Sequence, residues 1–357
     1  MKRILCTLIA AMMVSVVAYP QESQEIDELK ARLAKLEKKN DKIEKIVNAL
    51  PKISGYLQMG YESASGSNSF YTKRLRLSLA GNISSKVDYK LQIDFAGTPK
   101  IIDAYFRYKP FTELNFQFGE FKLPFSMEST DNTPNKMEFV DYPLPVRKLL
   151  NYADICGIAG SGRDIGLQLY GSLFELNGHK LLKYNLGLFN GNGINVKDNN
   201  HRKNVVGRLT IEPIKGFAVA GSIMLGSYGA DNFKRDRYSI GVAYNSSLLF
   251  AKGEYLIGRT AGLEADKTLG SYGYWATIGG KLGKKQSWIP ALKFESFTYD
   301  KDDSDTRQNN LCAAITWIPV SIGNFQLRTM AYYTREMYTA KNKDDNNVVG
   351  IAFIAGF

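Results

Sequence analysis

The spacing of apolar residues changes once along this chain, near residue 52. Before that point apolar residues recur three and four positions apart, with Lys and Glu between them, and Asn40 fills the one gap. This register predicts a coiled-coil helix of about four heptads. A single amphipathic helix packed on a neighbour would show the same spacing. We favour the coiled coil, and hence a homo-oligomer of undetermined number, because residues 21–50 lack glycine and end at Pro51. The seam consists of Ile26, Leu29, Leu33, Leu36, Ile43, Val47 and Leu50.

From Ile53 onward the period is two. Residues 74–79, for example, read Arg-Leu-Arg-Leu-Ser-Leu, which is the alternation of a strand with one apolar face. We count 16 candidate strands of about ten residues each, although 14 or 18 would also fit. They lie near 53–62, 74–79, 87–95, 102–109, 112–119, 163–171, 181–190, 204–212, 217–226, 237–245, 249–259, 271–282, 290–299, 310–318, 324–334 and 347–357.

The size of this sheet decides which face is inside. A barrel of about 16 strands is too wide for side chains to fill, so water occupies it and the charged face points inward. The apolar face then meets lipid, where one Arg or Lys at mid-membrane would cost about 2–4 kcal/mol. From the second strand on, the outward positions carry no charge at their centres, and no linker divides the region. The pattern therefore predicts an all-β membrane protein, an antiparallel transmembrane β-barrel, rather than a soluble sandwich.

The two ends of the chain indicate export to an outer membrane. Lys2 and Arg3 precede an apolar stretch from Ile4 to Val17, which is typical of a cleaved signal peptide over about residues 1–18. The last strand alternates to a terminal Phe357. Bacterial outer-membrane barrels typically end this way, which implies recognition by the barrel-assembly machinery. We therefore expect a signal peptide at 1–18, a periplasmic coiled-coil segment at 19–51 and a barrel in outer-membrane lipid at 52–357.

Composition agrees with a barrel and excludes other classes. The 357 residues include 21 Tyr, 19 Phe and only 3 Cys, with a formal charge of +11. The mean hydropathy of −0.24 excludes a polytopic helical membrane protein. The chain is also neither collagen-like nor a disulfide scaffold.

Catalysis has no support in the sequence. The two histidines, His179 and His201, lie in polar turn-like stretches outside any HExxH pattern, and no Walker-type phosphate loop occurs. Cys156 and Cys312 have no CxxC partner, and we do not expect the disulfide that export would allow them to form. We expect no enzyme activity, no cofactor, no metal and no nucleic-acid partner.

The inward positions carry a modest excess of positive charge, eleven bases against seven acids. Such a bias raises the local anion concentration in a pore. Arg74 and Arg76 stand out, because two guanidinium groups on one face suit oxyanions. The longest irregular segment, about 120–161, should fold into the lumen and narrow it, and it carries four bases against six acids. The inward bases are Arg74, Arg76, Lys90, Arg107, Lys109, Lys183, Arg208, Lys252, Lys281, Lys293 and Arg328.

Several segments resemble the phosphate-selective porin O and P family, in the order that the family shows. The most specific is Gly119–Glu128, which reads Gly-Glu-Phe-Lys-Leu-Pro-Phe-Ser-Met-Glu. The resemblance covers the barrel from about residue 53 to the end, and the preceding coiled coil also looks like that family. The other matching segments are 94–97, 103–108, 116–118, 162–166 with Gly171, 185–193, and 206–209 with Pro213.

The resemblance implies a trimeric, 16-stranded outer-membrane porin with a basic channel and an inward-folded third loop. The family's motif lysine corresponds to Lys122, while Arg74, Arg76 and Arg107 occupy basic strand positions like those that line such channels. The acidic loop is a departure from the family. We expect a diffusion channel for small hydrophilic solutes, neutral or anionic, with a mild preference for anions such as phosphate, lined by Arg74, Arg76, Lys90, Arg107, Lys109, Lys122, Arg208 and Arg328.

Two alternatives stay open. The first is a dedicated phosphate or polyphosphate channel. The second is an adhesin or scaffold whose barrel only anchors the coiled coil. The scaffold is disfavoured because the coil precedes the barrel, on its periplasmic side, and because the lumen positions carry so many charges.

Overall fold

A computed structural model describes residues 28–39, 50–264 and 267–357. The chain divides into two compact units, Met1–Pro51 and Lys52–Phe357. In the first unit residues 28–39 form a helix, on which Leu29, Leu33 and Leu36 are exposed. The rest of the heptad seam up to Val47, with Asn40, and the whole predicted signal peptide lie outside the described residues. The coiled coil and the signal peptide therefore stay predictions.

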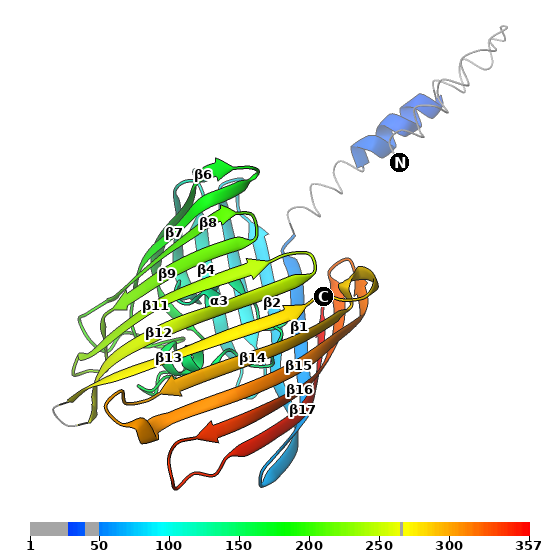
Figure 1. Cartoon of the computed structure of the whole chain (residues 1–357). Helices are drawn as coiled ribbons and strands as arrows, with labels where there is room; N and C mark the ends of the chain where they lie inside the picture. The colour runs from blue at the N-terminus through cyan, green and yellow to red at the C-terminus, as the bar shows by residue number, and fades with distance from the viewer. Residues whose placement is uncertain (1–27, 40–49, 265–266) are drawn as a thin grey trace. The chain divides into compact units, whose positions relative to one another are not determined.

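The second unit is a closed antiparallel barrel of 16 strands, which confirms the predicted fold and strand number (Figure 1). The last strand pairs with the first, and Gly55 and Phe357 exchange two backbone hydrogen bonds of 3.0 Å where the barrel closes. A further two-residue strand, β10 (Ser227–Tyr228), follows β9 and pairs with the first residues of β11. The barrel strands are β1 (Lys52–Ala64), β2 (Ser67–Asn82), β3 (Val87–Asp94), β4 (Lys100–Tyr108), β5 (Asn115–Lys122), β6 (Arg163–Leu176), β7 (His179–Phe189), β8 (Asn204–Ile214), β9 (Phe217–Leu225), β11 (Phe233–Asn245), β12 (Leu249–Glu264), β13 (Lys267–Gly280), β14 (Trp288–Thr298), β15 (Arg307–Ile322), β16 (Phe325–Tyr338) and β17 (Asn346–Gly356).

The apolar face of the strands points outward, as the alternation predicts. On β2, Leu75 and Leu77 are 42% and 38% exposed, whereas Arg74 and Arg76 between and beside them are 8% and 6% exposed. Phe353 at the end of the chain is also exposed on the outer wall. Among the described residues, no helix is both long and apolar enough to cross a membrane.

The two ends of the barrel differ in their connections. The end that holds Lys52 and Phe357, here the terminal end, has short turns such as 177–178 and 215–216. The opposite end, here the loop end, has the long connections 123–162 and 190–203. Outer-membrane barrels carry their short turns on the periplasmic side and their long loops outside. The terminal end is therefore the periplasmic end.

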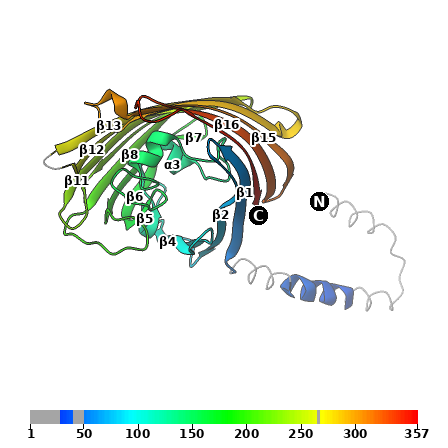
Figure 2. The ribbon, with the colours of Figure 1, turned by 90° about the horizontal axis from the view of Figure 1, so that it is seen from below.

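Residues 123–162, here the inner segment, lie inside the ring of strands (Figure 2). They contain two short helices, α3 (Met127–Asp131) and α4 (Leu144–Leu149). Apolar side chains of this segment are fully buried against apolar side chains of the inner wall. The packed residues include Phe125, Tyr142, Val146 and Leu149 from the segment and Val206, Met224, Leu256, Trp275 and Phe297 from the wall.

This packing corrects one expectation. The alternation argument places charged and polar residues toward the lumen, but the inner wall of β8–β14 also presents Leu256 and Trp275 inward. The inner segment covers these side chains, so they avoid water without facing lipid. Gly273 shows how closely the segment approaches, because a Cβ there would lie 2.6 Å from Cβ of Pro145 in α4.

Candidate functional site

A polar cavity of about 500 Å³ remains on the side of the lumen that the inner segment leaves open. Its wall is formed by β1–β7, and the inner segment forms its other side through residues between Pro124 and Lys136. It extends to Gly55 and Phe357 at the terminal end. Five basic side chains line this cavity against one acidic side chain, Asp103. The bases are Arg76, Lys90, Lys122, Lys136 and Arg163.

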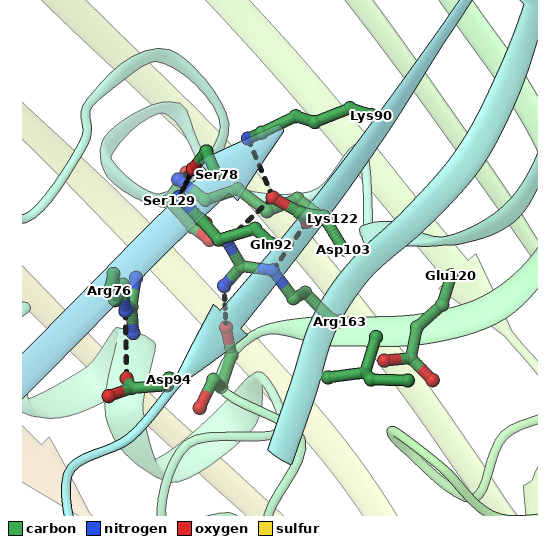
Figure 3. A network of polar contacts seen from close by, with 12 residues as sticks. Arg76, Ser78, Lys90, Gln92, Asp94, Asp103, Glu120, Lys122, Ser129 and Arg163 are labelled. Atoms are coloured by element: carbon green, nitrogen blue, oxygen red, sulfur yellow. Dashed lines mark hydrogen bonds and ion pairs between the residues drawn. The ribbon is translucent and has the colours of Figure 1, made fainter. Parts of the chain in front are cut away.

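Asp103 is shared by two of these bases. Lys90 donates a hydrogen bond of 2.8 Å to its Oδ2, and Arg163 donates one of 2.8 Å to its Oδ1 (Figure 3). Arg163 and Asp103 are each about 4% exposed, so water screens this pair weakly. Because two cations share one carboxylate, the cluster carries one excess positive charge. Its two donor groups converge on the carboxylate of Asp103.

Arg76 is held by an acid outside the cavity. Its Nε donates to Asp94 Oδ2 at 2.8 Å, and its guanidinium lies 5.7 Å from the ring centre of Tyr56. Figure 3 shows this pair apart from the Asp103 cluster. Arg76 therefore adds hydrogen-bond donors to the wall but little net charge.

Lys122 faces the cavity without a carboxylate partner among the described residues. Its Nζ donates to the backbone oxygens of Ser129 and Asn132 at 2.6 and 2.8 Å. The two hydrogen bonds tie Lys122 to the start of the inner segment. The dipoles of these carbonyl groups, rather than a carboxylate, balance the ammonium charge. Gly119 lies earlier on the same strand with a φ of 128°, in the region that favours glycine. Phe116 is exposed outside, whereas Lys122 at the end of β5 lines the cavity.

Lys136 is the second cation of this kind. It is exposed at the tip of the inner segment, and the described residues give its Nζ no ion pair. It also lines an adjoining cavity of about 210 Å³ toward β15–β17. Arg328 borders that second cavity, where it donates to the backbone oxygens of Asn135 and Met137 at 2.6 and 3.2 Å.

The sequence-predicted site residues thus fall into two groups. Arg76, Lys90 and Lys122 line the main cavity, and Arg328 lines the adjoining one. The other four lie outside these two cavities. Arg107 and Lys109 both pair with Asp88 near the terminal end, at 2.7 and 2.6 Å. Arg74 donates to Gln58 and to the backbone oxygen of Val140, and Arg208 forms a bidentate pair with Asp131.

The acids of the inner segment pair with wall bases away from the main cavity, and none of them lines it. Glu128 and Glu138 share Lys252 at 2.8 and 2.7 Å. Asp141 pairs with Lys73 at 2.5 Å. Burial raises the pKa of Asp141, but the neighbouring cations, Lys73 above all, outweigh burial and hold that pKa well below its usual range. The acidic composition of the segment therefore does not oppose anions in the cavity.

Asp154 anchors the far end of the inner segment. Arg235 and Arg237 of β11 donate to its two oxygens at 2.7 and 3.3 Å, and all three side chains are fully buried. Burial raises the pKa of this carboxyl, but the two guanidinium groups outweigh burial and hold it well below the usual range. The nearby Cys156 thiol lies 3.3 Å from Arg237 Nη2, and burial raises its pKa to about 11.

Cys156 and Cys312 are free thiols, so the disulfide that the sequence allowed does not form. Cys156 lies beside Arg237 of β11, whereas Cys312 is buried on the inner wall of β15 under the inner segment. No group of metal-ligating side chains occurs within 28–39, 50–264 and 267–357.

Arg163 and Lys136 are the cavity-lining bases that alternation misses. Counting by two from exposed Leu167 would place Arg163 on the lipid side, but the strand has just begun there and the side chain reaches Asp103 instead. Lys136 lies in irregular chain without a period. The resemblance did include Arg163 within the matching segment 162–166.

Residues 54–237 match the family model of phosphate-selective porin O and P. The chain belongs to this family. The porin is also similar in fold to the anion-selective porin from Comamonas acidovorans, with a TM-score of 0.62 at 10% identity, over 86% of this chain and 99% of that one. Outer-membrane protein OmpT of Vibrio cholerae in its trimer form gives 0.61 at 11% identity, over 86% and 99%. OmpF of Salmonella typhi in complex with daunomycin gives 0.57 at 11% identity, over 86% and 98%. No curated protein matches the sequence.

Family and fold together make this porin an outer-membrane channel. Porins of this family and fold are typically passive channels rather than enzymes.

Proposed function

We propose that the porin lets small hydrophilic solutes diffuse across the outer membrane with a mild preference for anions, phosphate among them. The observation that carries the proposal is the lining of the main cavity, with five bases against one acid. Counting Asp94, which neutralises Arg76, leaves a formal excess of three positive charges. A basic lining within a wall of low dielectric constant concentrates anions and repels cations.

The position of each cation supports this preference. Lys122 and Lys136 lack carboxylate partners among the described residues, so their fields are not cancelled locally. Arg163 and Lys90 are fixed by Asp103, so they lose little conformational freedom when an anion arrives. Arg74, which the sequence favours for oxyanions, is instead engaged with Gln58 and the inner segment.

We further propose that the mature porin starts after a signal peptide of about 18 residues, enters the membrane through the barrel-assembly machinery and forms a homotrimer. OmpT, which is similar in fold, has a trimer form. The exposed Leu29, Leu33 and Leu36 would form the contact between periplasmic helices of neighbouring copies.

A planar-bilayer recording tests the proposed function. Across a KCl gradient, the reversal potential of the unmodified porin should show chloride more permeant than potassium. Added phosphate should reduce the chloride current, because phosphate competes for the same basic lining. Greater permeability to potassium would contradict the proposed preference, and a chloride current unaffected by phosphate would remove phosphate from the proposal.

A further inference from the structure

The outer wall carries an apolar groove of about 520 Å³ over β11–β15. Small residues, Ala251, Gly253 and Ala276, supply its centre, where larger side chains are missing. Tyr244 and Phe294, both exposed, stand among the larger residues that border it. The groove lies on the face that meets lipid, so a hydrocarbon group must fill it.

A cationic turn lies at the terminal end of the same strands. The connection between β13 and β14 contains the short helix η1 (Lys284–Gln286), and Lys284 and Lys285 are both exposed there. The described residues give neither lysine an ion pair. Gln286 donates to the backbone oxygen of Ser247 at 2.7 Å, which ties this turn to the one between β11 and β12. Two ammonium groups without an ion pair among the described residues thus lie at the terminal end of the strands that form the groove.

An aromatic pair marks the level of the membrane surface beside this turn. Trp288 at the start of β14 stacks on Trp317 of β15 with 5.8 Å between ring centres, and each is 43% exposed. Tryptophan favours the interface between hydrocarbon and headgroups. The groove thus runs into the hydrocarbon from the periplasmic interface, and the lysines lie at headgroup level.

We propose that the groove and the turn bind one anionic glycerophospholipid of the periplasmic leaflet. An acyl chain would fill the groove over Ala251 and Ala276, and the headgroup phosphate would lie between Lys284 and Lys285. Lysines beside a membrane surface attract anionic lipid. Contact with a second copy of the porin is the competing occupant, and the groove variants below distinguish it.

Quenching of tryptophan fluorescence by lipids with brominated acyl chains tests the proposal on the full-length porin in vesicles. Trp288 and Trp317 face the lipid, whereas Trp275 is buried on the inner wall and gives an unquenched background. Brominated phosphatidylglycerol should quench more than brominated phosphatidylcholine at equal mole fraction. The apparent affinity ratio should be roughly fivefold or more, as expected from one or two lysines at the surface.

Charge variants separate this turn from the rest of the periplasmic rim. Lys284→Gln with Lys285→Gln should reduce the affinity ratio toward one. Lys52→Gln with Lys86→Gln removes two exposed charges from the same rim on another part of the barrel, and should leave the ratio unchanged. Equal quenching by the two lipids in the unmodified porin, or an unchanged ratio in the first variant, would overturn the proposal.

Groove variants test the acyl chain. Ala276→Leu fills the groove and should weaken quenching by both lipids. Ala331→Leu, at an exposed position of the outer wall on β16, is the matched control and should not. A folded Ala276→Leu barrel that quenches normally but has lost its oligomeric state would show that the groove is a contact between copies, and would also overturn the proposal.

Discussion

At the scale of single residues, the net charge along the lumen depends on which bases have a carboxylate partner. Eleven inward bases against seven inward acids suggest only a weak bias along the sequence. The structure distributes that bias. Arg107 and Lys109 share Asp88 near the rim, which leaves one excess positive charge there, whereas Lys122 is balanced by carbonyl oxygens alone. Most of the excess charge therefore lies beside the open cavity.

Asp103→Asn should increase the preference for anions. The carboxylate of Asp103 is the one acid of the main cavity, and it occupies the place between Lys90 and Arg163. One unit charge at about 4 Å and an effective dielectric constant near 20 corresponds to about 4 kcal/mol before salt screening, so a severalfold rise in the chloride-to-potassium permeability ratio is expected. Reversal potentials measure it. Asp302→Asn, on an exposed loop, is the control, and an equal ratio in native and Asp103→Asn channels would exclude Asp103 as a determinant.

Alternation alone finds part of this site. It identifies Arg76, Lys90 and Arg328 correctly as inward, because they lie in regular stretches of strand. It cannot report that Arg328 is held by the carbonyls of Asn135 and Met137, since those partners are 191 and 193 residues away in sequence. It also fails at strand ends, as at Lys122 and Arg163, and there the family resemblance carries the information instead.

At the scale of elements, the inner segment is a small apolar core folded against the wall. All 16 strands are found in the segments that the period of two predicts, because lipid on one face and lumen on the other impose that period. No such periodicity in the sequence predicts the conformation of the inner segment. Its helices are short, and its position depends on long-range partners such as Glu254, which accepts hydrogen bonds from Ser126 and the backbone of Met127.

Asp154→Asn should release the far end of the inner segment. Arg235 and Arg237 would then be left buried without their carboxylate, at a cost of about 3–5 kcal/mol to the docking of the segment. Larger or noisier single-channel conductance is expected, while the barrel itself should stay folded. Asp302→Asn again serves as the control, and a conductance identical to that of the native channel would show that this cluster does not hold the segment.

The pH dependence of Cys156 alkylation also reports whether the far end of the inner segment is released. Its thiol has a pKa raised to about 11, so in a Cys312→Ser background alkylation by iodoacetamide should be slow at pH 8 and rise about tenfold per pH unit toward pH 11. With Asp154→Asn the thiol should become exposed, its pKa should fall toward the ordinary value, and alkylation at pH 8 should accelerate. A native thiol that reacts at pH 8 as fast as free cysteine would contradict the buried placement.

At the scale of the whole molecule, the chain consists of one closed barrel, which separates lipid from lumen, and a first unit that contains a helix. Backbone hydrogen bonds close within each chain, so the barrel does not need a partner to satisfy its edges. Any oligomer must then be stabilised by the outer wall, by the predicted coiled coil, or by both.

Deletion of residues 21–50 should weaken the oligomer without preventing insertion. The predicted heptads contribute to assembly, whereas the barrel hydrogen bonds do not depend on them. Thermal dissociation in mild detergent, followed by gel mobility, measures the change, and heat-modifiable mobility of the monomer shows that the barrel is folded. An oligomer of unchanged thermal stability would show that this segment is not an assembly element.

The most direct test of the account is the reversal potential of the Lys136→Glu porin in a KCl gradient. Lys136 borders both cavities, lies on the exposed tip of the inner segment and has no ion pair among the described residues, so reversing its charge should leave the fold intact. The account predicts a native channel that prefers chloride and a Lys136→Glu channel shifted toward potassium, while Lys215→Glu, at an exposed turn outside the two cavities, shows no shift. A native channel that prefers potassium, or a Lys136→Glu channel with the native reversal potential, would contradict it.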